Sequence, residues 1–107
     1  MLDLKEELET TGIKFKPLYW VKAPAYPYGI FDDVVLYRGD DEKLRIVEHD
    51  TTLELYAEKI DYESEKKIED WIDSKDFEFK KTRIWIDSEK HYSTIYEFSF
   101  TEKKGVN

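Results

Sequence analysis

The stretch RIWIDSEKHYSTIYEFSF, residues 83–100, decides the fold of this chain. Two apolar runs flank the polar residues 87–90, which have the length and composition of a hairpin turn. The second run alternates between large and small or polar residues, which is typical of a strand with one buried face. Its alternating positions hold Tyr92, Thr94, Tyr96, Phe98 and Phe100. The stretch therefore predicts an antiparallel hairpin with one aromatic face.

The residues before this hairpin change from a strand pattern to a helix pattern. Residues 51–58 place Leu53 and Leu55 on one side and Tyr56 on the other, which predicts a strand with one solvent-exposed face. Residues 61–75 follow a helical period with Asp61 as the N-cap. One side of this predicted helix carries an apolar stripe of Ile68, Trp71 and Ile72.

The first part of the chain predicts a short helix, an edge strand and a loop. Residues 2–11 carry leucines one helical turn apart and end at a glycine, so they predict a helix. Residues 13–16 alternate until Pro17 ends the pattern, which is typical of a strand at a sheet edge. The loop KAPAYPYG follows at residues 22–29, and a polar connection at residues 38–43 predicts another hairpin.

These elements predict an α+β fold, with a mostly antiparallel sheet built from hairpins and two helices packed on one face. The chain has 107 residues, which is the length of one domain. We expect a single α+β domain over residues 1–101 and a flexible C-terminal tail over residues 102–107.

Composition narrows the possible partners. The net charge is −8, from 25 acidic and 17 basic residues. Affinity for a nucleic-acid backbone comes from Lys and Arg that displace counterions, so specific nucleic-acid binding is not expected. The chain has no Cys, which excludes disulfides and thiolate chemistry. It shows no signal-like start and no apolar run of about 18 residues, so we expect a protein of a soluble compartment without a membrane span.

Few residues are suited to chemistry. His49 and His91 fall in separate predicted strands, and we expect both to be solvated, because two histidines without Cys supply too few ligands for a transition metal. The adjacent acids Asp32 and Asp33 point to opposite faces of a strand and are expected to be solvated charges. No nucleophile elbow and no glycine-rich phosphate loop occurs. We therefore expect no catalytic residue, no metal and no cofactor, and a protein that is not an enzyme.

Aromatic side chains are the remaining candidates for function. Tyr26 and Tyr28 lie in the proline loop, and Tyr56 lies on the wet side of its strand. Two interpretations stay open, because tyrosine suits a partner interface and also an ordinary aromatic-rich core. We take Tyr26, Tyr28 and Tyr56 as candidate interface residues, and the acidic turn residues Asp40 and Asp41 as an opposing patch.

Two segments of the sequence resemble a known family. They are LELYAEKIDYESEKKIEDWID at residues 53–73 and FEFKKTRIWIDSEKHYSTIYEFSF at residues 77–100. Their order of strand, charged helix and aromatic hairpin is similar to the C-terminal half of tail completion or tail terminator proteins from long, non-contractile-tailed phages and prophages of Gram-positive bacteria. The leucine-containing helix and the proline-tyrosine loop resemble the beginning of these proteins. The resemblance spans most of the chain, and its motifs are structural rather than catalytic.

The resemblance implies a structural virion protein with an α+β fold. Such a protein assembles as a ring, typically of six subunits, which caps the finished tail tube and docks it to the head connector. The implied partners are further copies of the chain, the major tail tube protein and a head-completion protein. The implied location is the head–tail junction of the virion, after assembly in the host cytoplasm. An acidic ring would let DNA pass without holding its phosphates.

Two alternatives to the tail terminator stay open. A head–tail stopper or another connector component comes from the same gene block and also forms small rings. A small acidic phage protein could instead be a monomeric inhibitor that mimics DNA through its carboxylates. Residues 61–75 interleave acids with lysines, whereas a DNA mimic would favour a purer acidic face.

Overall fold

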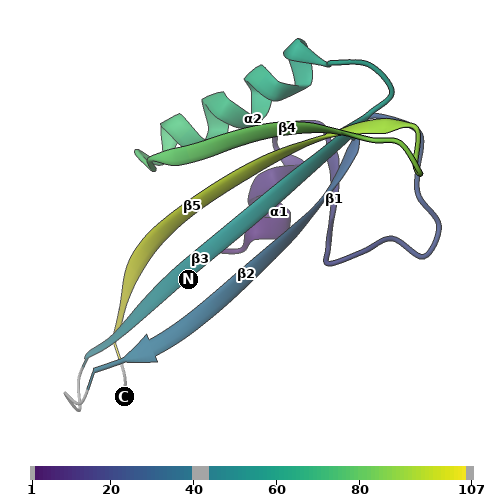
Figure 1. Cartoon of the computed structure of the whole chain (residues 1–107). Helices are drawn as coiled ribbons and strands as arrows, with labels where there is room; N and C mark the ends of the chain where they lie inside the picture. Colours follow the sequence, from purple (N-terminus) through teal and green to yellow (C-terminus); the bar gives the residue numbers. More distant parts are fainter. Residues whose placement is uncertain (1, 40–43, 106–107) are drawn as a thin grey trace.

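The computed structural model describes residues 2–39 and 44–105, which form one five-stranded sheet and two helices (Figure 1). The strand order in the sheet is β1-β2-β3-β5-β4. The elements are α1 (Leu4–Glu9), β1 (Lys14–Pro17), β2 (Tyr28–Arg38), β3 (Leu44–Ala57), α2 (Tyr62–Ser74), β4 (Phe79–Ile86) and β5 (His91–Gly105). This arrangement confirms the predicted α+β class.

Both predicted hairpins are present. Strands β4 and β5 pair antiparallel from Ile86 opposite His91, and the turn between them ends with Lys90 in the left-handed region at φ 55°. Strands β2 and β3 pair antiparallel from Arg38 opposite Ile46. The turn of this second hairpin, residues 40–43, lies outside the described residues. Hairpin geometry therefore makes the central part of the sheet antiparallel.

Strand β1 occupies one edge of the sheet, as the sequence predicts, and it pairs parallel to β2. Phe15 of β1 lies opposite Gly29 of β2. A methyl group on Gly29 would lie 2.4 Å from a ring carbon of Phe15 and 2.5 Å from the carbonyl oxygen of Glu54. Only glycine leaves room for the Phe15 ring at this point. Gly29 therefore allows β1 to pair closely with β2.

Both helices pack on the same face of the sheet. Phe31, Leu53 and Tyr96 lie opposite one another on β2, β3 and β5, and all three are buried on this face. The helices cover them with five buried side chains: Leu4 and Leu8 from α1, and Ile68, Trp71 and Ile72 from α2. The predicted apolar stripe of α2 and the predicted placement of the helices on one face are confirmed. We call this side the covered face and the other side the open face.

A three-stranded arm extends beyond the helices. Figure 1 shows β2, β3 and β5 continuing to the lower left, past α1 and α2. Strand β1 pairs with β2 only as far as Phe31, and β4 pairs with β5 only as far as Phe98. The arm, which we define as residues 32–38, 44–50 and 99–105, gives the molecule a long axis of 50 Å.

The prediction of a flexible tail from residue 102 is wrong for residues 102–105. They belong to β5, which pairs with β3 up to Gly105 opposite Leu44. The segment is polar, so no apolar alternation marks it as a strand in the sequence. Backbone hydrogen bonds to β3 hold it, and such bonds leave no trace in side-chain chemistry.

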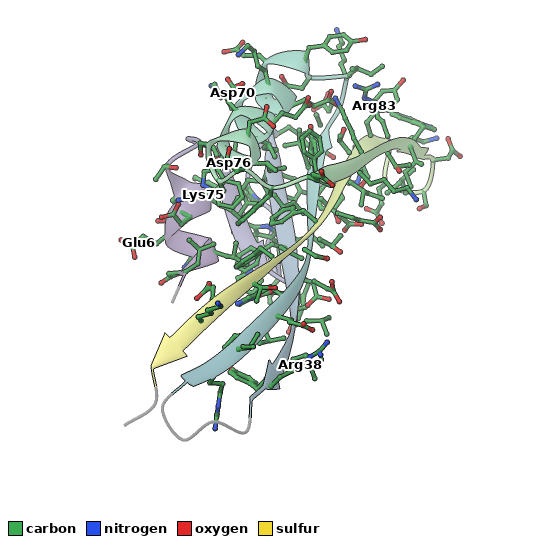
Figure 2. The ribbon with its side chains drawn as sticks, turned by 90° about the vertical axis from the view of Figure 1, so that its left-hand side faces the viewer. Glu6, Arg38, Asp70, Lys75, Asp76 and Arg83 are labelled. Carbon is green, nitrogen blue, oxygen red and sulfur yellow. The ribbon has the colours of Figure 1, made fainter. Side chains whose placement is uncertain are left out.

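A buried ion cluster joins α2 to the last hairpin. The Glu65 side chain is almost fully buried, and its carboxylate accepts hydrogen bonds from Arg83 Nε at 2.9 Å and Thr94 Oγ1 at 2.7 Å. Lys81 Nζ lies 2.9 Å from the same carboxylate. Figure 2 shows Arg83 on the β4 side of the molecule, near α2. Burial by itself would raise the pKa of Glu65, but the bonds from Arg83, Lys81 and Thr94 outweigh it and hold the pKa at about 2.

The core position of Trp71 makes a testable prediction about the placement of α2. Truncation of this buried ring in Trp71→Ala should lower the free energy of unfolding by about 3 to 5 kcal/mol. The exposed Asp73 on the same helix is the control, and Asp73→Ala should change it by less than about 0.5 kcal/mol. Urea unfolding followed by circular dichroism measures both. A loss below about 1 kcal/mol for Trp71→Ala would show that α2 packs elsewhere.

The Glu65 cluster predicts a loss of stability in acid. Its folded pKa of about 2 lies below the ordinary value of 4.5, so the unfolded chain takes up this proton first as the pH falls. The stabilisation, on the order of 3 kcal/mol, is present above pH 4.5 and is lost between pH 4.5 and 2. The measurement compares urea unfolding of the native chain and Glu65→Gln over this range. Parallel pH profiles for the two proteins would contradict the prediction.

Candidate functional site

The aromatic residues singled out in the sequence meet at one end of the open face. Tyr28 lies opposite Tyr56 in the β2–β3 ladder, and their ring centroids are 5.3 Å apart. The loop before β2 brings Tyr26 against Tyr28 at 5.5 Å. We call this cluster, together with Trp20 and His91, the aromatic end.

Two members of the aromatic end, His91 and Trp20, are not among the interface residues predicted from the sequence. The Tyr26 hydroxyl is hydrogen-bonded to His91 Nδ1 at 3.0 Å, and the Tyr56 ring stacks on the His91 ring at 4.7 Å. Trp20 Nε1 donates to the carbonyl oxygen of Gly29 at 2.8 Å. These bonds fix the loop of residues 18–27 over the end of the sheet.

The three tyrosines differ in their accessibility. Tyr28 is buried, Tyr56 is half-buried and Tyr26 is partly exposed. Burial raises the pKa of Tyr28, and burial together with the hydrogen bond to Glu54 raises the pKa of Tyr56. The Tyr28 ring forms the centre of the cluster, so it is the least accessible of the three, and its role in an interface stays a prediction. Asp40 and Asp41 of the predicted opposing patch lie outside the described residues.

An exposed apolar segment adjoins the aromatic end. Leu18, Tyr19 and Val21 are 59%, 65% and 84% exposed, and we call them the apolar rim. With Trp20 they form the run LYWV directly after Pro17, and this run of four apolar residues in a loop is the signal in the sequence that marks the rim. The rim borders a depression whose floor includes Tyr28, Ile30, Tyr56, Ile86 and His91.

The backbone of Leu18 holds the rim in place. Its φ of 66° lies in the left-handed region, which a leucine adopts only when its surroundings require it. The surroundings here are two hydrogen bonds, from Leu18 N to the Phe31 carbonyl at 2.9 Å and from Tyr19 N to the Pro17 carbonyl at 2.8 Å. The chain thus turns sharply out of β1 and presents apolar side chains to solvent.

The prediction that both histidines are solvated is wrong. His91 is buried in the aromatic end, and His49 is buried on the covered face at the base of the arm. His49 Nδ1 lies 2.7 Å from Asp33 Oδ2, and its ring stacks on Phe100 at 4.2 Å. Strand alternation puts position 49 on the covered face, so this histidine links β2, β3 and β5.

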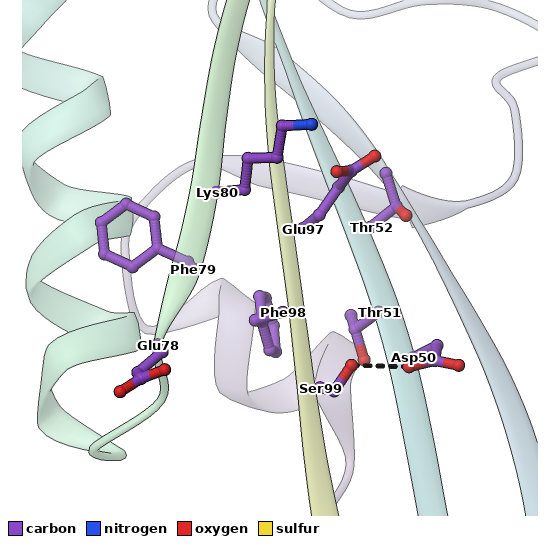
Figure 3. A pocket seen from close by; sticks show the side chains of 9 residues that line it. All are labelled: Asp50, Thr51, Thr52, Glu78, Phe79, Lys80, Glu97, Phe98 and Ser99. Atoms are coloured by element: carbon purple, nitrogen blue, oxygen red, sulfur yellow. Dashed lines mark hydrogen bonds between the residues drawn. The ribbon is translucent and has the colours of Figure 1, made fainter.

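A polar hollow on the open face is a second candidate site. Figure 3 shows Glu97, Lys80 and Thr52 around it, with the Ser99 hydroxyl bonded to Asp50 at 2.5 Å. In a Ser-His-Asp triad, a histidine between the serine and the acid takes the serine proton. His49, the neighbour of Asp50 in the chain, is on the covered face, so the sheet separates it from this serine.

Comparison with protein families and with curated proteins gives no assignment, so a function has to be inferred from the surfaces described above. No protein-family model matches the chain, and no curated protein matches it. Within residues 2–39 and 44–105, no helix has both the length and the apolar character needed to cross a membrane. In the same part of the chain, no group of three or more His, Asp or Glu side chains is placed to hold a metal ion.

The different roles of Tyr28 and Tyr19 are testable by truncation. Tyr28→Ala removes a buried ring from the aromatic end and should lower the free energy of unfolding by about 3 kcal/mol. Tyr19→Ala removes an exposed ring and should change it by less than about 0.5 kcal/mol. Equal losses in urea unfolding would show that the rim is part of the folded core rather than a surface.

Proposed function

We propose that this protein is a structural subunit of a phage tail and that it terminates the tail tube as a ring. The observation that carries the proposal is the apolar rim of Leu18, Tyr19 and Val21, which the fold holds in solvent beside the aromatic end. Large apolar side chains gathered at one place on a monomer are typical of surfaces that meet another protein. The rim is the contact surface in this proposal, and no reaction is assigned to the chain.

The proposed ring requires a heterologous contact, to which the rim contributes one side. Subunits of a cyclic ring meet through two different patches, so an apolar projection on one subunit fits a depression on the next. The rim supplies one such patch, since Leu18, Tyr19 and Val21 line a depression together with Ile30, Ile86 and His91. A ring closed through such contacts gains stability that a small isolated domain lacks.

The acidic side chains of the open face are compatible with the inner wall of a ring through which DNA passes. Asp32, Asp50 and Glu97 are exposed on it, and they repel phosphates rather than bind them. Lys80 lies directly opposite Glu97 in the β4–β5 ladder, so this acidic surface is interrupted. The interruption favours the ring subunit over a DNA-mimicking inhibitor, which remains the alternative from another functional class.

The sequence resemblance gives the specific form of the proposal. The strand, charged helix and aromatic hairpin that resemble tail terminators are β3, α2 and the β4–β5 hairpin. The partners proposed from it are the major tail tube protein and a head-completion or stopper protein. A stopper role is the nearest alternative, because a stopper uses the same kind of small ring at the same junction.

Deletion of the gene in the phage or prophage that carries it tests the proposal. We expect filled heads beside unattached tails of irregular, often excessive length in electron micrographs. Normal tails with heads that leak DNA would favour the stopper, and normal virions would favour the inhibitor.

Complementation of the deletion tests the rim itself. The double variant Tyr19→Glu with Val21→Glu places charge on the rim and should fail to restore joined virions while the purified variant stays folded. The matched control is Tyr62→Glu, which replaces an exposed tyrosine on α2 outside the rim and should restore them. Full restoration by the rim variant would show that the contact surface lies elsewhere.

A further inference from the structure

The arm of the sheet carries an open strand edge. Strand β1 covers the edge of β2 only as far as Phe31, because Leu18 turns away with its positive φ. At the other end, Gly39 has a φ of 110°, so the chain leaves the extended conformation there and β2 ends. Within the part of the chain that the structure describes, no strand therefore pairs with the outer side of residues 32–38 of β2, and Val35 lies at the centre of this edge.

The unpaired backbone groups on this edge are identified by one hydrogen bond. The Phe31 carbonyl accepts from Leu18 N, directly after β1, so it points away from β3. Backbone groups alternate along a strand, so those of Asp33, Val35 and Tyr37 also point outward. Such groups are a template for an added strand.

The side chains of this edge are self-complementary about Val35. In an antiparallel pair centred on Val35, Asp32 lies opposite the partner's Arg38, and Val34 lies opposite the partner's Leu36. Val34 and Leu36 are 63% and 54% exposed in the single chain, and both lie on the open face. Arg38, which also pairs with Glu48 at 2.9 Å in its own chain, lies at the far end of the arm in Figure 2. The symmetric arrangement covers both apolar side chains and makes each ion pair twice.

A second pair of complementary side chains lies on the covered face. Tyr37 is 54% exposed there, with Arg45 over its ring, and in the same pairing it lies opposite the partner's Asp33. Asp33 borders a hollow formed with Leu2, Leu4, Pro17 and Phe31. The exposed tyrosine of one copy is thus directed at a hollow of the other.

We propose that two copies of this chain associate through antiparallel pairing of residues 32–38 of β2, with the two-fold axis at Val35. The inference goes beyond the proposed ring and does not depend on it. It joins two sheets into one continuous sheet with both helix layers on the same side.

The other uncovered edge of the arm does not fit as well. No strand among residues 2–39 and 44–105 pairs with the outer side of residues 99–105 of β5 either, but this edge carries Lys103, and lysine at an edge opposes strand addition. A side-by-side pairing of β2 with the free part of β5 at equal height would place Arg38 beside Lys103. These like charges favour the two-fold β2 pair instead.

Reversing the charge of either partner in the proposed ion pair tests the pairing. Sedimentation over a concentration series should show a dimer for the native chain and a dimer dissociation constant raised about tenfold or more for Asp32→Arg and for Arg38→Asp. Each single variant places like charges opposite each other twice. An equal mixture of the two variants restores both ion pairs, so it should form a 1:1 heterodimer in native mass spectrometry. Glu97→Arg makes the same charge change on β5 of the open face and should leave the dimer unchanged.

Cross-linking tests the position of the axis. The chain contains no Cys, so Val35→Cys can form a disulfide only with the same residue of the partner. A hydrogen-bonded antiparallel pair has a Cα separation of about 5.5 Å, which a disulfide spans. Oxidation should give a covalent dimer of Val35→Cys and much less of Val21→Cys, which is the more exposed position. A native chain that is monomeric at all concentrations, or a mixture that does not restore pairing, would overturn the proposal. An oligomer unaffected by either charge variant would also overturn it.

Discussion

The antiparallel pairing of β3 with β5 is the constraint on which the rest of the structure depends. The two strands pair from Leu44 opposite Gly105 to Ala57 opposite Tyr92, and β2 and β4 are added on either side. The register of this pair fixes which side chains share a face, since a shift of one residue would exchange the two faces. It places Leu53 beside Tyr96, and the helices then have an apolar surface to cover.

The length of this pair also creates surfaces that a shorter sheet would not have. Two helices and two short outer strands cover one half of the ladder, and the other half continues as the arm. The covered half holds the core, while the arm exposes a strand edge and the loop at the opposite end exposes the apolar rim. Both proposed contacts therefore use parts of the chain that the core does not need.

Buried polar side chains are the second organising feature of the molecule. Glu65 is held between α2 and the last hairpin by Arg83 and Lys81, and the His49 ring is hydrogen-bonded to Asp33 between strands. A buried polar group is tolerated only when partners replace the water that it loses. Each cluster thus specifies one relative placement of elements that apolar contacts alone would leave less defined.

The sequence by itself determined the elements and their faces. Alternation in residues 92–100 and the stripe of Ile68, Trp71 and Ile72 report burial directly, so both hairpins, α2 and the α+β class were predictable. Only the tertiary structure decided the partners of the polar residues. His49 and His91 are buried and residues 102–105 form a strand, because cross-strand neighbours and backbone bonds are set by contacts between distant segments. The rim and the open edge of β2 have the same origin, since a surface exists only where the folded chain leaves a side chain or a strand uncovered.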